Sequence, residues 1–571
     1  MSNGLSRRGF LKGAMALGVG AAAAGALSGC GKAQTVPTEV DKHTQTHAGS
    51  TPDWLGEPPE VAESQITETL DYDVVVVGCR TGGLPAIISA AENGARVLGV
   101  DQSEKVNNPR EDIGAFGSQL QIEGFKQYPQ YAFTIDEHRE DLVRYANGFF
   151  DYDLYNVWAN ESGAMIDWIT AIISRNGHFT MNWEAGAETD RATSLCKDWS
   201  TSHSPQKLVD DKNVSFGSEL ADYAQELGAE FRWNARLVKC EQDATGRVTG
   251  VICCDTKDKH YLRINARNGV ILSTGGYAGN AEMLNARQPW NQAIRVNIPV
   301  GGGNSGDGIK AALWCGGHMD PVGAACMFNR ACVKPDQIAG NNIKGAWFWF
   351  GEQPFLKVNL LGKRFCNESG PYDYMLHSTV MQPYHTYVDI WDSDYFAQVD
   401  QMNEIGCCRL YPWGNGAPSN MDISAMPAML QKLEDNGYIQ RADTMEELAA
   451  KLNLPVDETV ATWEKYNEYA AQGYDPDYGK PAYRLTSLTH PPYFGVRTGA
   501  WYLASLDGVQ IDTNMHPKDD KGNPIEGLYL TGNDSGGLFA VSYPNLSTGF
   551  ACGRTMTFGR RAGRLAATQE A

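Results

Sequence analysis

The sequence predicts an α/β fold that opens with a β-α-β unit of a parallel sheet. Residues 71–77, DYDVVVV, form a short β-branched run of the kind buried in parallel sheets. The run leads into the glycine-rich stretch GCRTGG at 78–83, and a helical pattern follows at 84–93. A second apolar run at 95–100 ends in Asp101, about 20 residues past the glycines, where an acid can hydrogen-bond a ribose hydroxyl. This order is typical of a dinucleotide-binding unit.

The glycine stretch departs from the usual dinucleotide pattern at one position. The Gly-x-Gly-x-x-Gly pattern would need glycine at 78, 80 and 83 for a tight turn, close approach of the pyrophosphate and helix packing. The chain has Gly78, Gly82 and Gly83, but position 80 is Arg. The Arg80 side chain either points away and adds a cation near the phosphates, or obstructs the diphosphate at the helix N-terminus. We favour the first alternative, in which the dinucleotide still binds, because distant segments repeat the order of strand followed by glycine turn.

Two later segments repeat the order of strand followed by glycine turn. These are residues 269–277, GVILSTGGY, and residues 527–534, GLYLTGND. Between them and the first unit, the pattern predicts a helix at 217–227 and strands at 235–240 and 248–253. Such points of close backbone approach from distant segments make the set more specific than the first motif alone.

Composition excludes some classes of protein. The chain has 571 residues, with 68 acidic and 48 basic side chains and a net charge of −20, which argues against a nucleic-acid partner. With 42% hydrophobic and 20% charged residues, it is a globular chain of several domains. Its 13 cysteines form no haem-attachment motif and no paired zinc pattern, so neither haem nor metal is predicted.

The N-terminus has the pattern of an export signal. Residues 6–12, SRRGFLK, precede a small apolar run at 13–28 that is too short to span a bilayer. The order LSGC ending at Cys30 matches a bacterial lipoprotein cleavage site. We therefore expect a twin-arginine signal at 1–30, lipidation at Cys30 and a flexible tether at 31–68, with the protein exported to the outer face of the cytoplasmic membrane or the periplasm. An ordinary signal cut elsewhere, or an uncleaved anchor, remain alternatives.

Several motifs give the chain a family resemblance. They are VVVVG, ILSTGGYAGNAEM, GDG, GKRFCNE, GLYLTGN and TFGRRAG, spread over about 70–567. With them the sequence resembles the exported flavoproteins of the fumarate reductase, urocanate reductase and 3-ketosteroid dehydrogenase superfamily. The resemblance implies non-covalent FAD in a split Rossmann-like domain at 69–325 and 495–571, with an inserted α+β capping domain at 326–494. Substrates of that superfamily react between flavin and cap.

The motif positions supply candidate cofactor-binding residues. Asp307 either faces the flavin or caps a helix, and residues 546–548 open the last helix, whose N-terminal dipole favours negative charge on the reduced ring. The full candidate set is Gly78, Gly82, Gly83, Asp101, Gly114, Val238, Thr274, Gly275, Asp307, Asn533, Leu546 and Ser547.

The chain lacks the residues that fumarate reductases use to bind and protonate a dicarboxylate. The family's proton-donating Arg corresponds to Tyr372, and the relay Glu and Arg correspond to Phe348 and Gly351. The family's pair of histidines corresponds to Leu-Ala at 503–504, and the second clamp Arg is replaced within 542–546. Fumarate is therefore a poor candidate substrate, because its two carboxylates would be buried without charged partners.

Aromatic side chains occupy the segments that line the family's active site. Each one could be simple core packing, but together they favour a planar, apolar substrate. They are Trp347, Phe348, Trp349, Phe350, Phe355, Tyr372, Tyr374, Trp501, Tyr502 and Tyr543.

The resemblance and the aromatic set predict a reductase of an activated C=C bond in an aryl acrylate, enone or steroid-like molecule. Hydride would come from N5 of FAD, and a positioned acid would protonate the neighbouring carbon. Tyr372 stands at the position of the family's acid, and Tyr374 is the second choice. Tyr543 could donate to a substrate carbonyl.

The electron donor is expected to be a separate molecule, a multihaem cytochrome or a flavin carrier linked to quinol oxidation, because the tether leaves no room for a haem domain. Two other functions remain open. One is a ketosteroid-type dehydrogenase that runs in the opposite direction. The other is a flavin-free lipoprotein that binds small molecules. This alternative arises because Arg80 stands where the dinucleotide pattern needs glycine.

Overall fold

The computed structural model describes residues 52–186, 197–297, 303–340, 344–402, 406–419 and 421–570. The predicted signal, Cys30 and the first part of the predicted tether lie outside the described residues and stay predictions. Residues from Trp54 onward form one compact unit. In the part of the chain that is described, no helix has both the length and the apolar character needed to cross a bilayer.

The first sheet contains the predicted dinucleotide unit. Its path runs β6-β2-β1-β9-β8-β7, and β17 pairs with β9 on the same sheet. The pairs β1–β2, β1–β9, β2–β6 and β9–β17 are parallel, whereas β7–β8 and β8–β9 are antiparallel. The strands are β1 (Ile66–Val77), β2 (Val97–Val100), β6 (Glu230–Arg232), β7 (Ala235–Gln242), β8 (Val248–Asp255), β9 (Tyr261–Leu272) and β17 (Leu528–Leu530).

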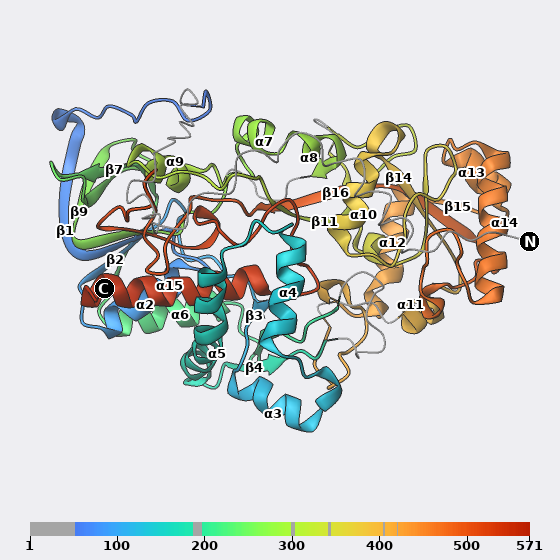
Figure 1. Ribbon diagram of the computed structural model, residues 1–571, viewed down its shortest axis with the longest axis horizontal. Helices are drawn as coiled ribbons and strands as arrows, with labels where there is room; N and C mark the ends of the chain where they lie inside the picture. The colour runs from blue at the N-terminus through green and yellow to red at the C-terminus, as the bar shows by residue number, and fades with distance from the viewer. Residues whose placement is uncertain are drawn as a thin grey trace, which may run out of the picture. The chain divides into compact units, whose positions relative to one another are not determined.

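Helices cover this sheet and fix the first glycine turn. Helix α2 (Gly83–Glu92) follows β1, and the C-terminal helix α15 (Phe550–Thr568) packs along it (Figure 1). A Cβ at Gly559 or Gly563 of α15 would overlap carbonyl oxygens of α2 and its N-cap, so these glycines allow the two helices to approach closely. The predicted α/β fold is confirmed in this region.

The folded unit begins earlier than the predicted end of the tether at residue 68. Trp54 is buried, and β1 starts at Ile66, where it pairs with Tyr261 of β9. The first half of β1 alternates partly buried and exposed residues, and its exposed positions are polar. For this reason the sequence of this segment looked like part of a flexible tether. The tether prediction is therefore wrong for this last part.

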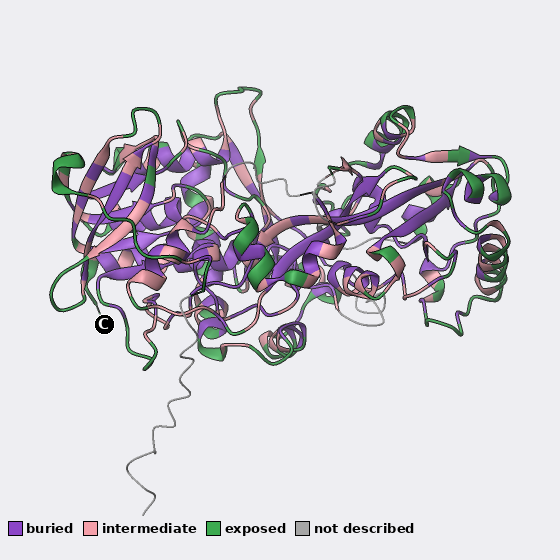
Figure 2. Ribbon diagram, turned by 90° about the horizontal axis from the view of Figure 1, so that it is seen from above, coloured by how far each residue is buried: buried purple, intermediate pink, exposed green. Residues whose placement is uncertain are grey.

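A second, mostly antiparallel sheet joins strands of the region predicted as the cap to β10 and β16, which lie largely in segments predicted for the FAD-binding domain. Its path is β12-β11-β16-β14-β13, and both β10 and β15 also pair with β16. The strands are β10 (Arg295–Asn297), β11 (Ala325–Val333), β12 (Ala346–Trp347), β13 (Leu356–Asn359), β14 (Tyr387–Asp392), β15 (Gln440–Ala442) and β16 (Tyr493–Ser505). The predicted boundary at 494/495 falls inside β16; the domain limits stay a prediction. Figure 2 shows the strands of both sheets largely buried.

A small three-stranded sheet and several helices complete the fold. The small sheet has the order β3-β5-β4. Its strands are β3 (Ile113–Gly114), β4 (Phe179–Trp183) and β5 (Ser202–Lys207). The remaining helices are α3 (Gln119–Gln127), α4 (Ile135–Tyr145), α5 (Tyr152–Ser174), α6 (Phe216–Glu226), α7 (Ala281–Arg287), α8 (Pro289–Ile294), α9 (Asp307–Trp314), α10 (Tyr372–Val380), α11 (Tyr395–Met402), α12 (Met426–Asp435), α13 (Met445–Lys451) and α14 (Val456–Gln472).

A buried ion-pair cluster holds the GKRFCNE segment against the loop after α14. Arg364 forms paired hydrogen bonds with Glu368, both at 2.8 Å, and with Asp475, at 3.1 and 2.8 Å. Lys480 lies 3.7 Å from Glu368. Arg364 and Glu368 thus have a structural role in this motif.

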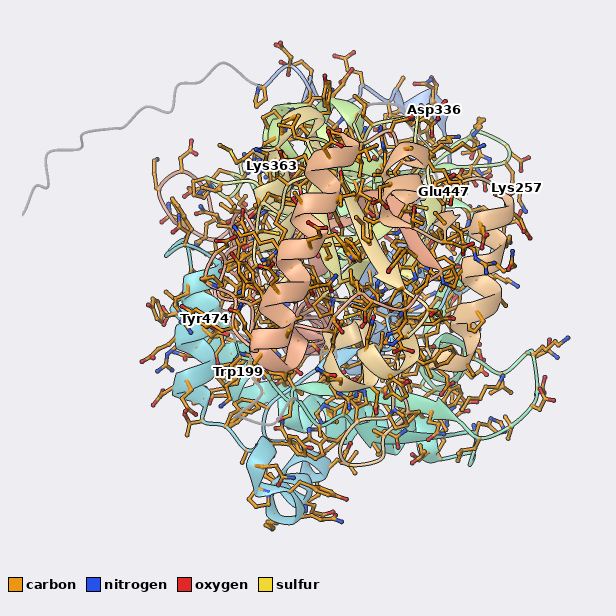
Figure 3. All side chains as sticks on the ribbon, turned by 90° about the vertical axis from the view of Figure 1, so that its right-hand side faces the viewer. Trp199, Lys257, Asp336, Lys363, Glu447 and Tyr474 are labelled. Atoms are coloured by element: carbon orange, nitrogen blue, oxygen red, sulfur yellow. The ribbon has the colours of Figure 1, made fainter. Side chains whose placement is uncertain are left out.

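Replacing Arg364 by Met is expected to lower the free energy of unfolding by about 3–5 kcal/mol, because both buried carboxylates would lose the cation to which they are hydrogen-bonded. Denaturant unfolding measures the change. The control is Lys363→Met. The neighbouring Lys363 side chain, which is labelled in Figure 3, is 57% exposed, so its loss should change stability by less than about 0.5 kcal/mol. Equal effects of the two substitutions would contradict this account.

Candidate active site and cofactor site

The first glycine turn tolerates no side chain at its key positions. Gly78 has φ of 96°, and a Cβ there would overlap the carbonyl oxygen of Ser273, which follows β9. A Cβ at Gly83 would overlap the carbonyl oxygen of Gly78, and one at Gly82 would come 2.7 Å from Oγ of Ser273. The turn therefore lies tightly between two strands, with the N-terminus of α2 behind it, which is the geometry that receives a phosphate group.

Arg80 does not close this turn. Its side chain is exposed, and Nη2 donates a hydrogen bond to the carbonyl oxygen of Asn108 at 3.2 Å. Two cavities adjoin Arg80. Arg80 lines both of them, so the residue borders a space that a diphosphate could cross.

The inner cavity has a volume of about 550 Å³ and lies over the carboxyl ends of β1, β2 and β9. The middle cavity, of about 380 Å³, continues from it toward the second sheet. They share Arg80, Ser273, Thr274 and Asn304. The two together form one long trough, and a dinucleotide is an elongated ligand that needs such a space.

Many of the predicted cofactor residues line this trough. Gly78, Asp101, Thr274 and Asp307 line the inner cavity. Gly82, Thr274, Gly275 and Asn533 line the middle cavity.

Two acids at the inner cavity already have protein partners. Asp101 accepts hydrogen bonds from the backbone N–H groups of Cys79 and Ser103, both at 2.8 Å, and from the Ser103 hydroxyl at 2.6 Å. Asp307 is the first residue of α9 and forms a two-point ion pair with Arg236, at 2.7 and 2.9 Å. Gly306 is the N-cap of α9, so Asp307 stands in the first turn of the helix and borders the inner cavity.

Other predicted cofactor residues lie behind the trough. Gly114 donates its N–H to the carbonyl oxygen of Gly549 at 2.8 Å, and a side chain there would strike Gly549. Val238 lies at the irregularity where β7 and β8 change register, next to Leu237, which does line the inner cavity. These residues support the trough from outside.

The last helix begins later than predicted. The structure starts α15 at Phe550, with Gly549 at φ 78° as its N-cap, whereas the sequence placed the start at 546–548. Leu546 is buried, and Ser547 Oγ lies 2.7 Å from Nε2 of His138. Neither residue is on the wall of the trough, because Leu546 packs with Tyr145 and Ser547 pairs with His138.

Asn545 and Thr548 line the middle cavity in place of those two residues, and both were missed by the sequence prediction. Each is buried, and both polar atoms of the Asn545 side chain and Oγ1 of Thr548 have no hydrogen-bond partner in the described part of the protein. Buried polar atoms without partners are costly, so these are suited to a polar ring system such as flavin. The residues present thus fit FAD. The turn signal in YPNLSTG could have indicated them.

The three candidate tyrosines lie in different surroundings. Tyr543 lines the middle cavity, and its hydroxyl oxygen accepts a hydrogen bond from the Ala551 N–H at 3.2 Å. Tyr372 is buried behind Phe328, with ring centroids 5.9 Å apart, and its hydroxyl contacts Sγ of Cys408. Tyr374 packs against Tyr145 with ring centroids 5.3 Å apart. Among these three, Tyr543 is the one found on the cavity wall.

Asp373 connects the two tyrosine segments. It follows Tyr372 in α10, is fully buried, and accepts a hydrogen bond from the Tyr543 N–H at 2.5 Å. Burial raises the pKa of its carboxyl well above the ordinary value. The Tyr543 loop is therefore fixed to the helix that carries Tyr372.

Asp534 makes the stability of this region depend on pH. Thr274 donates to it from both its N–H and its hydroxyl, the latter at 2.9 Å, yet burial raises its pKa to about 7. The stabilisation from the protonated form is complete below about pH 4 and is lost as pH rises to about 7.

Asp534→Asn is expected to remove that loss, so the unfolding free energy of the variant relative to the original protein should rise between pH 4 and 7, by at most about 4 kcal/mol. Urea unfolding at each pH measures it. A difference that stays constant over this range would show that Asp534 does not titrate there.

A third cavity, the outer groove, adjoins the middle cavity. Its volume is about 970 Å³, and the two share Arg110, Asp112, Phe328 and Leu503. Glu184, Arg330, Trp347 and Trp349 also line the outer groove. Leu503 and Ala504, which stand where the dicarboxylate family has histidines, line the middle cavity, so an apolar wall faces the end of the trough nearest the second sheet.

Comparison with known protein families identifies the family to which the chain belongs. The model of the family described as FAD binding domain matches residues 73–549, which is most of the chain. The chain belongs to this FAD-binding family. FAD is therefore its cofactor, and the chain is an FAD-dependent oxidoreductase, as the sequence predicted.

Individual relatives agree with the predicted superfamily. The FAD-binding chain is 26% identical over 509 residues to a vinyl phenol reductase of Lactiplantibacillus plantarum, which spans 87% of this chain and 96% of that protein. It is 31% identical over 353 residues to a 3-oxosteroid 1-dehydrogenase of Mycobacterium tuberculosis, covering 55% and 56%. The open conformation of a flavocytochrome c3 fumarate reductase has the same fold, with a TM-score of 0.60 and 22% identity over 88% of this chain and 79% of that chain.

Proposed function

We propose that this protein is an exported reductase of an activated C=C bond in an aryl acrylate, enone or steroid-like substrate, and not of fumarate. The observation that carries the proposal is the wall of the middle cavity, where Tyr543 and the apolar residues Leu503 and Ala504 lie together. Such a wall offers one proton-donating hydroxyl and otherwise apolar contacts.

Two cations line the rest of the cavity: Arg110 is paired with Asp112, and Arg80 donates to the carbonyl oxygen of Asn108. A dicarboxylate would therefore lack the pair of free cations that it needs.

The residues that would hold the cofactor are those that line the trough, from Gly78 and Asp101 to Thr274, Asn545 and Thr548. When bound without a covalent link, FAD supplies hydride transfer. The N-terminus of α15, whose residues Gly549 and Ala551 line the middle cavity, would stabilise negative charge there.

We propose Tyr543 as the group that donates a proton to the substrate. Its hydroxyl oxygen accepts from the first turn of α15, and a hydroxyl that accepts a hydrogen bond donates its own proton more readily. Asp373 holds the Tyr543 backbone in place. Tyr372 and Tyr374, the first choices from sequence, would then support the cavity wall from behind without contacting the substrate. Tyr372 does so by packing against Phe328.

The proposal includes export and an external electron source. The twin-arginine pattern and Cys30 support a lipid-anchored protein on the outer face of the cytoplasmic membrane or in the periplasm. A separate multihaem cytochrome or flavin carrier, linked to quinol oxidation, would supply electrons.

A ketosteroid-type dehydrogenase is the second candidate function, favoured by the 31% identity to a 3-oxosteroid 1-dehydrogenase over about half of each chain. The third possibility from sequence, a flavin-free binding protein, is excluded by the family match.

Anaerobic steady-state assays test the direction and substrate class. We expect the purified holoprotein, driven by a reduced viologen, to reduce cinnamates or an enone steroid and to leave fumarate unchanged. Dehydrogenation of a saturated ketosteroid with an artificial acceptor, without reduction of any alkene, would instead support the second candidate. Fumarate reduction would contradict both.

A further inference from the structure

Glu184 is a buried acid with an unsatisfied oxygen at the edge of the outer groove. Its residue is 3% exposed and lines the groove. Oε2 has no hydrogen-bond partner within the described residues. Burial raises the pKa of the carboxyl, while the hydroxyls of Ser204 and Ser202 lower it in part. A buried acceptor without a partner is costly, which favours a ligand that donates a hydrogen bond to it.

The small sheet fixes Glu184 in this position. The residue directly follows β4, and its N–H donates to the carbonyl oxygen of Ser202 in β5 at 3.0 Å. The preceding Trp183 is buried, with its Nε1 donating to the carbonyl oxygen of Ser200 at 2.9 Å. Successive side chains of an extended chain point to opposite faces, so Glu184 points away from Trp183 and toward the groove.

An aromatic wall from the second sheet also lines the groove. The rings of Trp347 and Trp349 have centroids 5.7 Å apart. The Arg330 guanidinium lies 3.8 Å from the Trp349 ring centroid and 4.5 Å from that of Phe328. Together these groups present flat surfaces on which a planar ring can stack.

The two arginines that line the groove are paired with acids. Arg330 is paired with Glu352, with nitrogen–oxygen distances of 2.7 and 2.6 Å. Arg110 is paired with Asp112 at 3.0 and 3.1 Å. Lys207 and Lys212 also line the groove, but both are exposed to solvent. Beside the buried Glu184 carboxyl a hydroxyl can donate a hydrogen bond, which a carboxylate cannot do.

We propose that the outer groove binds the far end of the substrate as an aromatic ring that bears a hydroxyl group, with the hydroxyl on Glu184 and the ring on the tryptophan wall. This inference rests on the proposed function, because the groove is the extension of the middle cavity past Phe328 and Leu503. It narrows the substrate to a hydroxylated aryl alkene.

Matched substrates and two variants test this subsite. The probes are 4-hydroxycinnamate and 4-methoxycinnamate, which differ in the hydrogen-bond donor. We expect Glu184→Leu to lower kcat/KM for the hydroxylated probe by about tenfold and to leave the methoxy probe within about twofold. Glu184→Gln, which keeps an acceptor, should lose less. The control Glu123→Gln replaces an exposed acid on α3. Equal losses for both probes in Glu184→Leu would overturn the subsite.

A binding measurement does not depend on turnover. By titration calorimetry on the oxidised holoprotein, the saturated product of the hydroxylated probe should bind about tenfold more tightly than its methyl ether, and Glu184→Leu should abolish the difference. No preference in the original protein, or tighter binding of an amino-substituted analogue, would overturn the proposal. If Glu184→Leu does not fold, the preference of the original protein for the hydroxylated product over its methyl ether still tests the subsite.

The two proposals can fail separately. If neither cinnamate is reduced but the hydroxylated product binds through Glu184, the reductase proposal is wrong and the subsite stands. If both cinnamates are reduced equally and Glu184 is without effect on either assay, the reductase proposal stands and the subsite is wrong.

Discussion

Tyr543→Phe is expected to lower kcat for alkene reduction by about 10²–10⁴-fold, the usual contribution of a positioned general acid. The variant keeps the ring that packs 5.7 Å from Phe539 and loses only the hydroxyl that lies at the first turn of α15. Rapid anaerobic mixing of reduced protein with substrate measures the chemical step, while the flavin absorbance shows that FAD is retained.

Two further substitutions make this result specific. Tyr372→Phe should cost less than about tenfold, because its hydroxyl contacts Cys408 and the ring stands behind Phe328. Tyr152→Phe, at an exposed position, is the control. If Tyr372→Phe abolishes activity and Tyr543→Phe does not, the acid is the residue that the sequence first indicated.

Gly83→Ala should abolish FAD binding and strongly reduce the yield of folded protein. Alanine is favoured over glycine in a helix by about 1 kcal/mol, so propensity alone predicts stabilisation. A Cβ at Gly83, however, would overlap the Gly78 carbonyl oxygen, and backbone on both sides of the turn cannot move without breaking the β1–α2 junction. Flavin content per protein and thermal unfolding measure the effect.

Gly94→Ala is the matched control for this substitution. Gly94 lies after α2 with φ of 83° and open space around its Cα, so alanine there introduces backbone strain of about 1 kcal/mol without a clash. FAD should remain bound. Full flavin content in Gly83→Ala would contradict the packing argument.

Local patterns predicted the cofactor half of the fold well. The β-branched run and the glycine turn correctly placed β1, α2 and β2, because hydrophobic period and turn chemistry are properties of neighbouring residues. The start of β1 at Ile66 was missed, since its first half is half-exposed and polar. The start of α15 was placed early, because the left-handed glycine at 549 is visible only in the backbone.

The site was predicted less completely for a physical reason. Whether a side chain reaches a cavity depends on packing between segments far apart in sequence. Tyr372 and Tyr543 are equivalent as residue types, but Phe328 shields one of them from the cavity. Asn545 and Thr548 become notable only when their missing hydrogen bonds are seen in three dimensions.

Single-turnover reoxidation tests the central claim most directly. The purified protein, reduced with one equivalent of dithionite under anaerobic conditions, is mixed with 4-hydroxycinnamate or with fumarate, and both the flavin spectrum and the product are measured. We predict complete reoxidation by the aryl alkene with one equivalent of saturated product, and none by fumarate. Reoxidation by fumarate, or a flavin that no alkene reoxidises, would contradict the account.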